Sequence, residues 1–205
     1  MNTKLSALLP VLALLAGCYP GGAEFVEDTD VVLTSYDQSY DFKAKSTYAM
    51  PSQIVVDVRI ELGDTTYEYM KPSFADPILA SIASNMTSLG YTRVDVSADP
   101  DLLLTPAGLT STTYFYSYWY NWWYGGYWGY WGWYYPPYVT VSSFTTGSLV
   151  MVLADPNAAS SSPINRSPSV WVGGVNGLFG GAYNVTRATT GINQAFQQSP
   201  YLKTN

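Results

Sequence analysis

Apolar and polar residues alternate along the chain between Ile54 and Leu62. Every second residue is isoleucine, valine or leucine, with Asp57, Arg59 and Glu61 between them. A period of two predicts a strand with one buried face. Runs of β-branched and aromatic residues predict further strands over 31–36, 46–50, 92–96, 170–172 and from 102 onward. The chain therefore contains enough strands for a sheet.

Two other stretches carry apolar residues at helical spacing. The first is predicted to begin at Asp76-Pro77, since aspartate caps a helix and proline suits its first position. It ends at Gly90, because glycine adopts the left-handed conformation that closes helices. Its apolar face consists of Leu79, Ile82, Ala83, Met86 and Leu89. The second helix is expected over 186–198, with Ala188, Ile192, Ala195 and Phe196 inward and Pro200 after its end.

The segment from Tyr114 to Tyr138 is dominated by aromatic residues. Ten of its 25 residues are tyrosine, six are tryptophan and one is phenylalanine, with four glycines among them. The flanks are rich in threonine, serine and valine, which favour strands. We interpret 109–153 as a long hairpin with the aromatic segment at its tip and Gly147 as a bulge in the returning strand.

The aromatic tip is the candidate binding site. One alternative is that its rings are part of the hydrophobic core and pack against the sheet. Each packed aromatic side chain buries roughly 150–250 Å², however, and the area of seventeen such side chains is more than the tip of a hairpin can bury. Exposed aromatic residues are typical of contact surfaces. The candidate binding residues are Trp119, Trp122, Trp123, Tyr127, Trp128, Tyr130, Trp131 and Trp133.

The N-terminal region reads as an export signal that ends at a lipidation site. Lys4 precedes an apolar run of about a dozen residues, too short to span a bilayer. Leu15, Ala16, Gly17 and Cys18 then resemble the lipobox of bacterial lipoproteins, in which the cysteine carries acyl chains. Cys18 is the only cysteine, so it has no disulfide partner. We expect a signal peptide over 1–17, a flexible acidic tether over 18–30 and a single domain over 31–205.

Charge and composition exclude several classes of function. The chain has 9 basic and 15 acidic residues and no histidine. Removing Lys4 with the signal leaves 8 against 15, about −7, so nucleic acid is not an expected partner. Because the chain has no histidine, we expect neither catalysis by a histidine nor a zinc site built on histidine. The aspartates at 95, 99 and 101 do not have EF-hand spacing, and we expect neither metal nor cofactor.

Five short motifs occur in an order that resembles a known family. They are Tyr40-Asp41-Phe42 with Thr47-Tyr48-Ala49, Leu89-Gly90-Tyr91, Asp101-Leu102-Leu103-Leu104, the run from Gly147 to Asp155, and Val170-Trp171-Val172-Gly173. The order is similar to that in bacterial lipoproteins built on domain of unknown function 4136. The resemblance implies an α+β fold, a mostly antiparallel sheet with two helices on one face, and a Gram-negative envelope location. Because Tyr19 follows the lipidated cysteine where inner-membrane lipoproteins carry aspartate, we expect the outer membrane.

These observations predict a lipid-anchored, non-catalytic binding or scaffolding module. Its partner would be an envelope protein or a second copy, contacted through the aromatic hairpin. Aromatic stacking on glycan or peptidoglycan is the alternative, and contact with the membrane is a third use of the same residues. A hydrolase with a carboxylate pair is a further alternative, since Glu61, Asp64, Glu68, Asp95, Asp99 and Asp101 are present.

Overall fold

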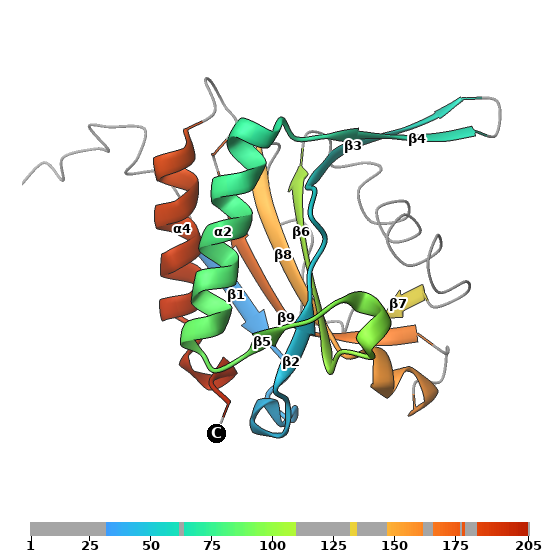
Figure 1. The fold of residues 1–205 in the computed structure, drawn as a ribbon, viewed down its shortest axis with the longest axis vertical. Coiled ribbons are helices and arrows are strands. Elements are labelled where there is room, and N and C mark those ends of the chain that lie inside the picture. Colours follow the sequence, from blue (N-terminus) through green and yellow to red (C-terminus); the bar gives the residue numbers. More distant parts are fainter. Residues whose placement is uncertain are drawn as a thin grey trace, which may run out of the picture.

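The computed structural model describes residues 32–61, 64–109, 132–134, 147–161, 166–176, 178 and 184–204. These residues form an α+β fold, as the sequence predicts (Figure 1). The helices are α2 (Pro72–Ser88) and α4 (Val185–Gln197). The strands are β1 (Val32–Tyr36), β2 (Thr47–Ala49), β3 (Val55–Glu61), β4 (Asp64–Tyr69), β5 (Thr92–Arg93), β6 (Leu102–Leu109), β7 (Gly132–Tyr134), β8 (Ser148–Ala154) and β9 (Arg166–Val175).

The sheet is mixed, so the expectation of a mostly antiparallel sheet is wrong. Its strand order is β1-β9-β8-β6-β2-β5. The pairs β1–β9, β8–β9, β6–β8 and β3–β4 are antiparallel, whereas β2–β5, β2–β6, β3–β6 and β7–β9 are parallel. The parallel pairs around β2 arise because α2 lies between β2 and its two partners in the chain. A helical crossover returns the chain in the same direction.

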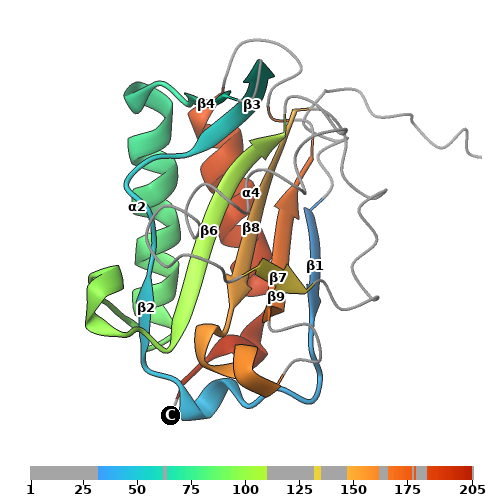
Figure 2. The ribbon, with the colours of Figure 1, turned by 90° about the vertical axis from the view of Figure 1, so that its right-hand side faces the viewer.

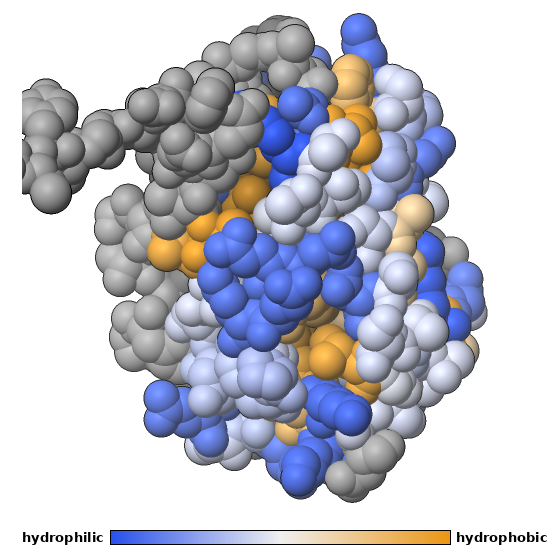
Figure 3. Space-filling view, turned by 90° about the vertical axis from the view of Figure 1, so that its left-hand side faces the viewer, coloured by the Kyte–Doolittle hydropathy of each residue, from blue (hydrophilic) through white to orange (hydrophobic). Residues whose placement is uncertain are grey.

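Both helices cover the same face of the sheet (Figure 2). They bury an apolar core against it that includes Ile82 and Met86 of α2, Ile192 and Phe196 of α4, and Trp171 of β9. The predicted inward residues of α4 are all buried, and those of α2 are buried or packed against the core. The outward surface of the helices is mostly polar, with small separate hydrophobic areas (Figure 3). On that side, Asn85 Nδ2 donates to Asn193 Oδ1 at 2.7 Å and links the helices.

The predicted start of α2 is wrong, and its predicted end is confirmed. The helix begins at Pro72, and Pro77 lies inside it. Proline suits the first position of a helix at residue 72 as well, and the additional turn buries Ala75 and packs Phe74 against the core. Gly90 has φ of 98°, as a helix-terminating glycine requires.

The last strand is longer than the sequence pattern predicts. Gly173 and Gly174 do not end it but pair with β1 and β8. At residue 173 a Cβ would lie 2.5 Å from the ring of Trp171, so this close approach requires glycine. Two strands were not predicted at all. They are β4, which pairs with β3, and β7, which lies within the aromatic segment.

Candidate functional site

Most of the residues proposed from the sequence as functional lie outside the described residues. This holds for the lipobox Leu15, Ala16 and Gly17, for Cys18, and for the predicted tether. It also holds for the candidate binding residues Trp119, Trp122, Trp123, Tyr127, Trp128, Tyr130 and Trp131, and therefore for the predicted hairpin tip. Trp133 lies in β7, whose backbone pairing is described.

The two ends of the segment 110–146 join adjacent strands of the sheet. Residue Leu109 ends β6 and Ser148 begins β8, and the two are partners in the antiparallel register. The backbone N–H of Gly147 donates to the carbonyl of Leu109 at 2.5 Å. Gly147 has φ of 92°, which only glycine adopts readily. The segment therefore leaves and re-enters the sheet at one end, as a hairpin base does.

Strand β7 fixes the middle of this segment at the opposite end of the sheet. Gly132, Trp133 and Tyr134 pair in parallel with residues 166–168 at the start of β9. The end of β9, Val175, pairs with Leu149 beside the hairpin base. Val175 lies eight positions after Ser167 in β9, which is about 26 Å of strand at about 3.3 Å per residue. The backbone of Trp133 therefore lies about 26 Å along the sheet from the end at which Leu109 and Ser148 pair.

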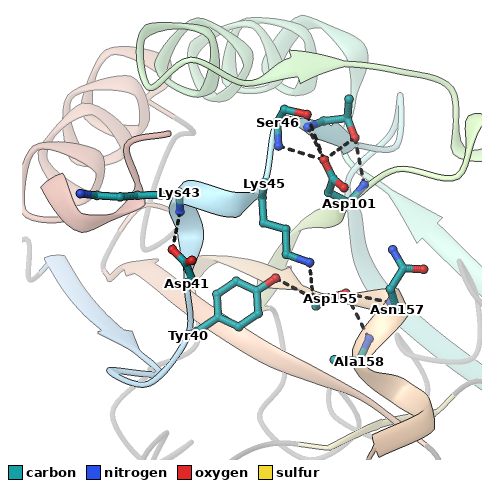
Figure 4. Close-up of polar contacts among 10 residues, drawn as sticks. Tyr40, Asp41, Lys43, Lys45, Ser46, Asp101, Asp155, Asn157 and Ala158 are labelled. Atoms are coloured by element: carbon teal, nitrogen blue, oxygen red, sulfur yellow. Dashed lines mark hydrogen bonds and ion pairs between the residues drawn. The ribbon is translucent and has the colours of Figure 1, made fainter. Parts of the chain in front are cut away.

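A buried carboxylate organises the same end of the sheet that β7 joins. Asp155 follows β8, and its side chain is 5% exposed. Its Oδ2 accepts from the hydroxyl of Tyr40 at 2.6 Å and from Lys45 Nζ at 2.8 Å, while its Oδ1 accepts from the backbone N–H groups of Asn157 and Ala158 at 2.8 and 3.2 Å (Figure 4). We call Tyr40, Lys45 and Asp155 the polar cluster. It pins the loop between β1 and β2 to the end of β8.

Asp101 makes a second set of contacts to the same loop. Its Oδ2 accepts from the backbone N–H and the hydroxyl of both Ser46 and Thr47, at 2.9 to 3.2 Å. Burial by itself would raise the pKa of Asp101, but these hydrogen bonds outweigh it and hold the pKa below its ordinary value. The carboxylate is therefore ionised at neutral pH and holds β2 against the start of β6.

The electrostatics of the polar cluster keep Tyr40 protonated. Burial raises the pKa of the Tyr40 phenol, and its hydrogen bond to Asp155 raises it further. The phenol therefore acts as a donor to the carboxylate and not as a base. The observed contacts of Asp101 and Asp155 are those of residues that hold loops in place.

Two of the carboxylates named for a hydrolase pair, Asp95 and Asp101, each accept hydrogen bonds from a loop. Asp95 accepts from the backbone N–H and the hydroxyl of Ser97 in its own turn, and Asp101 binds the β2 loop. In the part of the chain that the structure describes, no group of three or more acidic, cysteine or histidine residues is placed to hold a metal ion. Neither α2 nor α4, the helices described, is long and apolar enough to cross a bilayer.

Comparison with known proteins identifies the family. The sequence profile of domain of unknown function DUF4136 matches residues 32–201. The chain belongs to the DUF4136 family. A crystal structure of a DUF4136 family protein from Bacteroides thetaiotaomicron is 33% identical, with a TM-score of 0.64 over 85% of this chain and 97% of that one. No curated protein matches this chain significantly.

More distant solved structures also align with this DUF4136 chain. The PelC dodecamer from Paraburkholderia phytofirmans is 11% identical, with a TM-score of 0.42 over 86% of this chain and 99% of that one. A PDZ domain protein from Parabacteroides distasonis is 17% identical, with a TM-score of 0.42 over 84% of this chain and 36% of that one.

The family motifs meet at the polar cluster. Tyr40 and Asp155 come from the first motif and from the end of the fourth, and they form a direct hydrogen bond although 115 positions separate them in the chain. Asp101 opens the third motif and binds the same loop. Sequence reasoning missed Lys45, because a lone lysine in a polar loop usually points to solvent. The uncharged stretch before Asp155 was the available signal, since a carboxylate at the end of a buried strand needs a partner.

Proposed function

We propose that this DUF4136 chain is an envelope lipoprotein, anchored by acyl chains on Cys18, that works as a non-catalytic binding module. Its partner is an envelope protein or a second copy, contacted through the Tyr/Trp-rich segment. The localisation rests on the lipobox pattern of Leu15, Ala16, Gly17 and Cys18. Two or three acyl chains, at about 0.8 kcal/mol per buried CH₂, hold a protein stably on a membrane.

The strand register shows at which end of the sheet the predicted tether joins the domain. Val32 begins β1 and pairs with Val175, so the chain enters the sheet at the end where the aromatic segment is based. The thirteen residues between Cys18 and Val32 reach at most about 45 Å. The tether therefore joins the domain at the end that carries Leu109 and Ser148, and β7 and the polar cluster lie at the opposite end of the sheet.

The separation between β7 and the end where the tether enters supports a partner, and not the lipid surface, as the target of the aromatic residues. Trp133 lies in β7, about 26 Å along β9 from the end where the tether enters. An aromatic belt that enters a membrane lies at one level beside the anchor. The single observation that supports the proposal is the parallel pairing of β7 with β9, because it puts Trp133 at the end of the sheet opposite to the one where the tether enters.

Alanine substitution of Trp122, Trp123, Trp128 and Trp131 together tests the binding role. Cross-linked envelopes from cells that express this variant are compared with those from the unaltered strain by affinity capture and mass spectrometry. We expect the loss of one or a few specific partners, or of the self-association product. A matched control replaces four exposed helix residues, Ser84, Ser88, Gln194 and Gln197, with alanine and retains the partners.

Three results would contradict parts of the proposal. An unchanged partner profile in the tryptophan variant removes the aromatic contact. Retention on purified peptidoglycan that depends on the same tryptophans makes a glycan the ligand instead of a protein. An unmodified Cys18 thiol in the native host, with the protein in soluble extracts, removes the lipid anchor.

A further inference from the structure

Strand β1 lies at one end of the sheet and is more exposed than the strands at its centre. In the part of the chain that the structure describes, β9 is the one strand that pairs with β1. All five residues of β1 are partly exposed, whereas every residue of β6 and β8 is buried. Figure 2 shows β1 at the outer side of the sheet, with α4 behind the neighbouring strands. Neither described helix therefore blocks the approach of another strand to β1.

The register shows which backbone groups of β1 point away from β9. The N–H of Asp37 donates to the carbonyl of Val170 at 2.9 Å, and this pair continues the β1–β9 register by one position. In an antiparallel ladder, residues whose N–H and C=O groups face the partner strand alternate with residues whose groups face away. Leu33 and Ser35 therefore face β9, like Asp37.

The backbone groups of the alternate residues, Val32, Thr34 and Tyr36, point outward. None of the described residues forms a hydrogen bond with these outward groups. They are a row of three donors and three acceptors along the outer edge of β1, evenly spaced about Thr34.

The sequence of β1 lacks the features that keep an exposed edge from pairing. Such edges are usually protected by charged residues, proline, a bulge or a very short strand. Val32–Tyr36 contains neither a charged residue nor proline, and its register with β9 has no shift. At the other end of the strand order, β5 has only two residues, and one of them is Arg93. The two ends of the sheet are thus unlike, and β1 is the end that is suited to pairing.

We propose that the outer edge of β1 is a self-association interface. Two copies of the chain pair their β1 strands antiparallel about a two-fold axis at Thr34, and the two sheets join into one. Val32 of one copy then lies opposite Tyr36 of the other, and Thr34 lies opposite Thr34. These are the three residues with outward backbone groups, so each opposed pair exchanges two hydrogen bonds.

The symmetry of the edge is the reason to choose a second copy as the occupant. Because the outward residues are evenly spaced about Thr34, the strand is complementary to itself in this register. A β-branched residue opposite an aromatic residue and threonine opposite threonine are both stabilising cross-strand pairs. Since β1 carries no charge, no repulsion opposes the approach of the two edges.

The small size of the edge predicts a weak dimer. A stable interface buries roughly 800 Å² per partner, which is more than a strand of five residues supplies. We therefore expect a dimer that dissociates on dilution. The pairing requires neither the proposed lipid anchor nor the proposed aromatic contact, although confinement of two chains on one membrane would strengthen it.

Cysteine cross-linking tests the register in full-length protein in which Cys18 is replaced by serine. The test variant is Thr34→Cys, and the matched control is Gln38→Cys, an exposed position four residues along. The paired Cα atoms at position 34 are about 5.5 Å apart, within reach of a disulfide, whereas those at position 38 lie on opposite sides of the axis. Under mild oxidation we expect Thr34→Cys to form disulfide dimers at least about tenfold faster than the control. Equal rates, or a faster control, would indicate random collisions and overturn the inference.

Charged substitutions at position 34 test the two-fold symmetry. Thr34→Lys and Thr34→Glu each place like charges opposite one another, which destabilises an antiparallel pair. By sedimentation velocity we expect each variant to raise the dissociation constant of the dimer at least about tenfold, and an equimolar mixture of the two to recover dimer. Unchanged self-association of the single variants, or a mixture that stays monomeric although urea unfolding shows both to be folded, overturns the inference.

Amide hydrogen exchange in the unaltered protein decides the matter if a variant does not fold. The N–H groups of Val32, Thr34 and Tyr36 are expected to gain protection as the protein concentration rises. Those of Leu33 and Ser35, which face β9, are expected to be protected at every concentration. Protection of the outward groups that does not depend on concentration would show that the same chain covers the edge. Their lack of protection up to about 1 mM would show that the edge stays open even where a weak dimer forms. Either result overturns the inference.

The inference and the proposed function fail separately. Loss of partner capture in the variant with four tryptophans replaced, with the Thr34→Cys cross-link intact, bears on the proposed aromatic contact alone. Loss of that cross-link in the same variant would show that the aromatic segment, and not the edge of β1, holds the two copies together, and it would overturn the inference.

Discussion

Replacing Asp155 with alanine is expected to destabilise the protein by about 4 kcal/mol, because breaking a buried ion pair typically costs 3–5 kcal/mol. The carboxylate accepts four hydrogen bonds, two of them from Tyr40 and Lys45. Alanine leaves the Tyr40 hydroxyl without an acceptor. Lys45 is 19% exposed, so water solvates part of its charge and keeps the cost within that range.

Asparagine at position 155 separates the contributions of charge and capping. Its amide oxygen still accepts from the N–H groups of Asn157 and Ala158, since asparagine is as good a cap as aspartate. The attraction to Lys45 is lost. We expect Asp155→Asn to cost about 2 kcal/mol, roughly half of the effect of alanine, because hydrogen bonds to charged groups contribute about 1.5–3 kcal/mol.

Urea unfolding followed by tryptophan fluorescence measures both costs at pH 7. The matched control is Asp41→Ala, since Asp41 is exposed and accepts only the Lys43 N–H, at 3.1 Å, among the contacts seen. It is expected to cost no more than about 1 kcal/mol, as for loss of a cap. A cost below about 1 kcal/mol for Asp155→Ala, equal to the control, would refute the view that the polar cluster pins this end of the sheet.

Three further predictions test other parts of the fold. Tyr48→Phe is expected to leave stability unchanged or raise it by about 1 kcal/mol, because the buried Tyr48 hydroxyl has no hydrogen-bond partner. Tyr40→Phe is expected to lower stability, because it removes the hydrogen bond to Asp155. Equal effects of the two variants in urea unfolding would contradict this prediction. Since the folded state lowers the pKa of Asp101, its contribution is present above about pH 4 and lost as pH falls. Asp101→Asn therefore flattens the acid side of a stability–pH profile, and an unchanged profile refutes the assignment. In Gly191→Ala the added methyl group would clash with the Val175 side chain, so we expect the protein to lose about 1–3 kcal/mol of stability and its melting temperature to fall. An unchanged melting temperature would show that α4 can shift to make room for the methyl group.

Local patterns in the sequence predicted many of the helices and strands, because secondary structure depends largely on residues that are neighbours in the chain. The strands β1, β2, β3 and β8 and the helix α4 lie where period and turn residues place them. The motif order identified the DUF4136 family. The start of α2 was not determined by local patterns, because Pro72 and Pro77 both suit the first position of a helix. The packing of Phe74 and Ala75 against the core decides between them.

The sequence by itself determined most of the helices and strands, the family, and the separation of an acidic first half from an uncharged aromatic stretch. Only the tertiary structure decided which strands run parallel, that Asp155 meets Tyr40 and Lys45, and that β7 joins the far end of β9. The physical reason is the distance along the chain over which each kind of interaction acts. Propensity and periodicity act over a few residues, whereas strand partners and buried ion pairs are chosen by contacts between residues up to 115 positions apart.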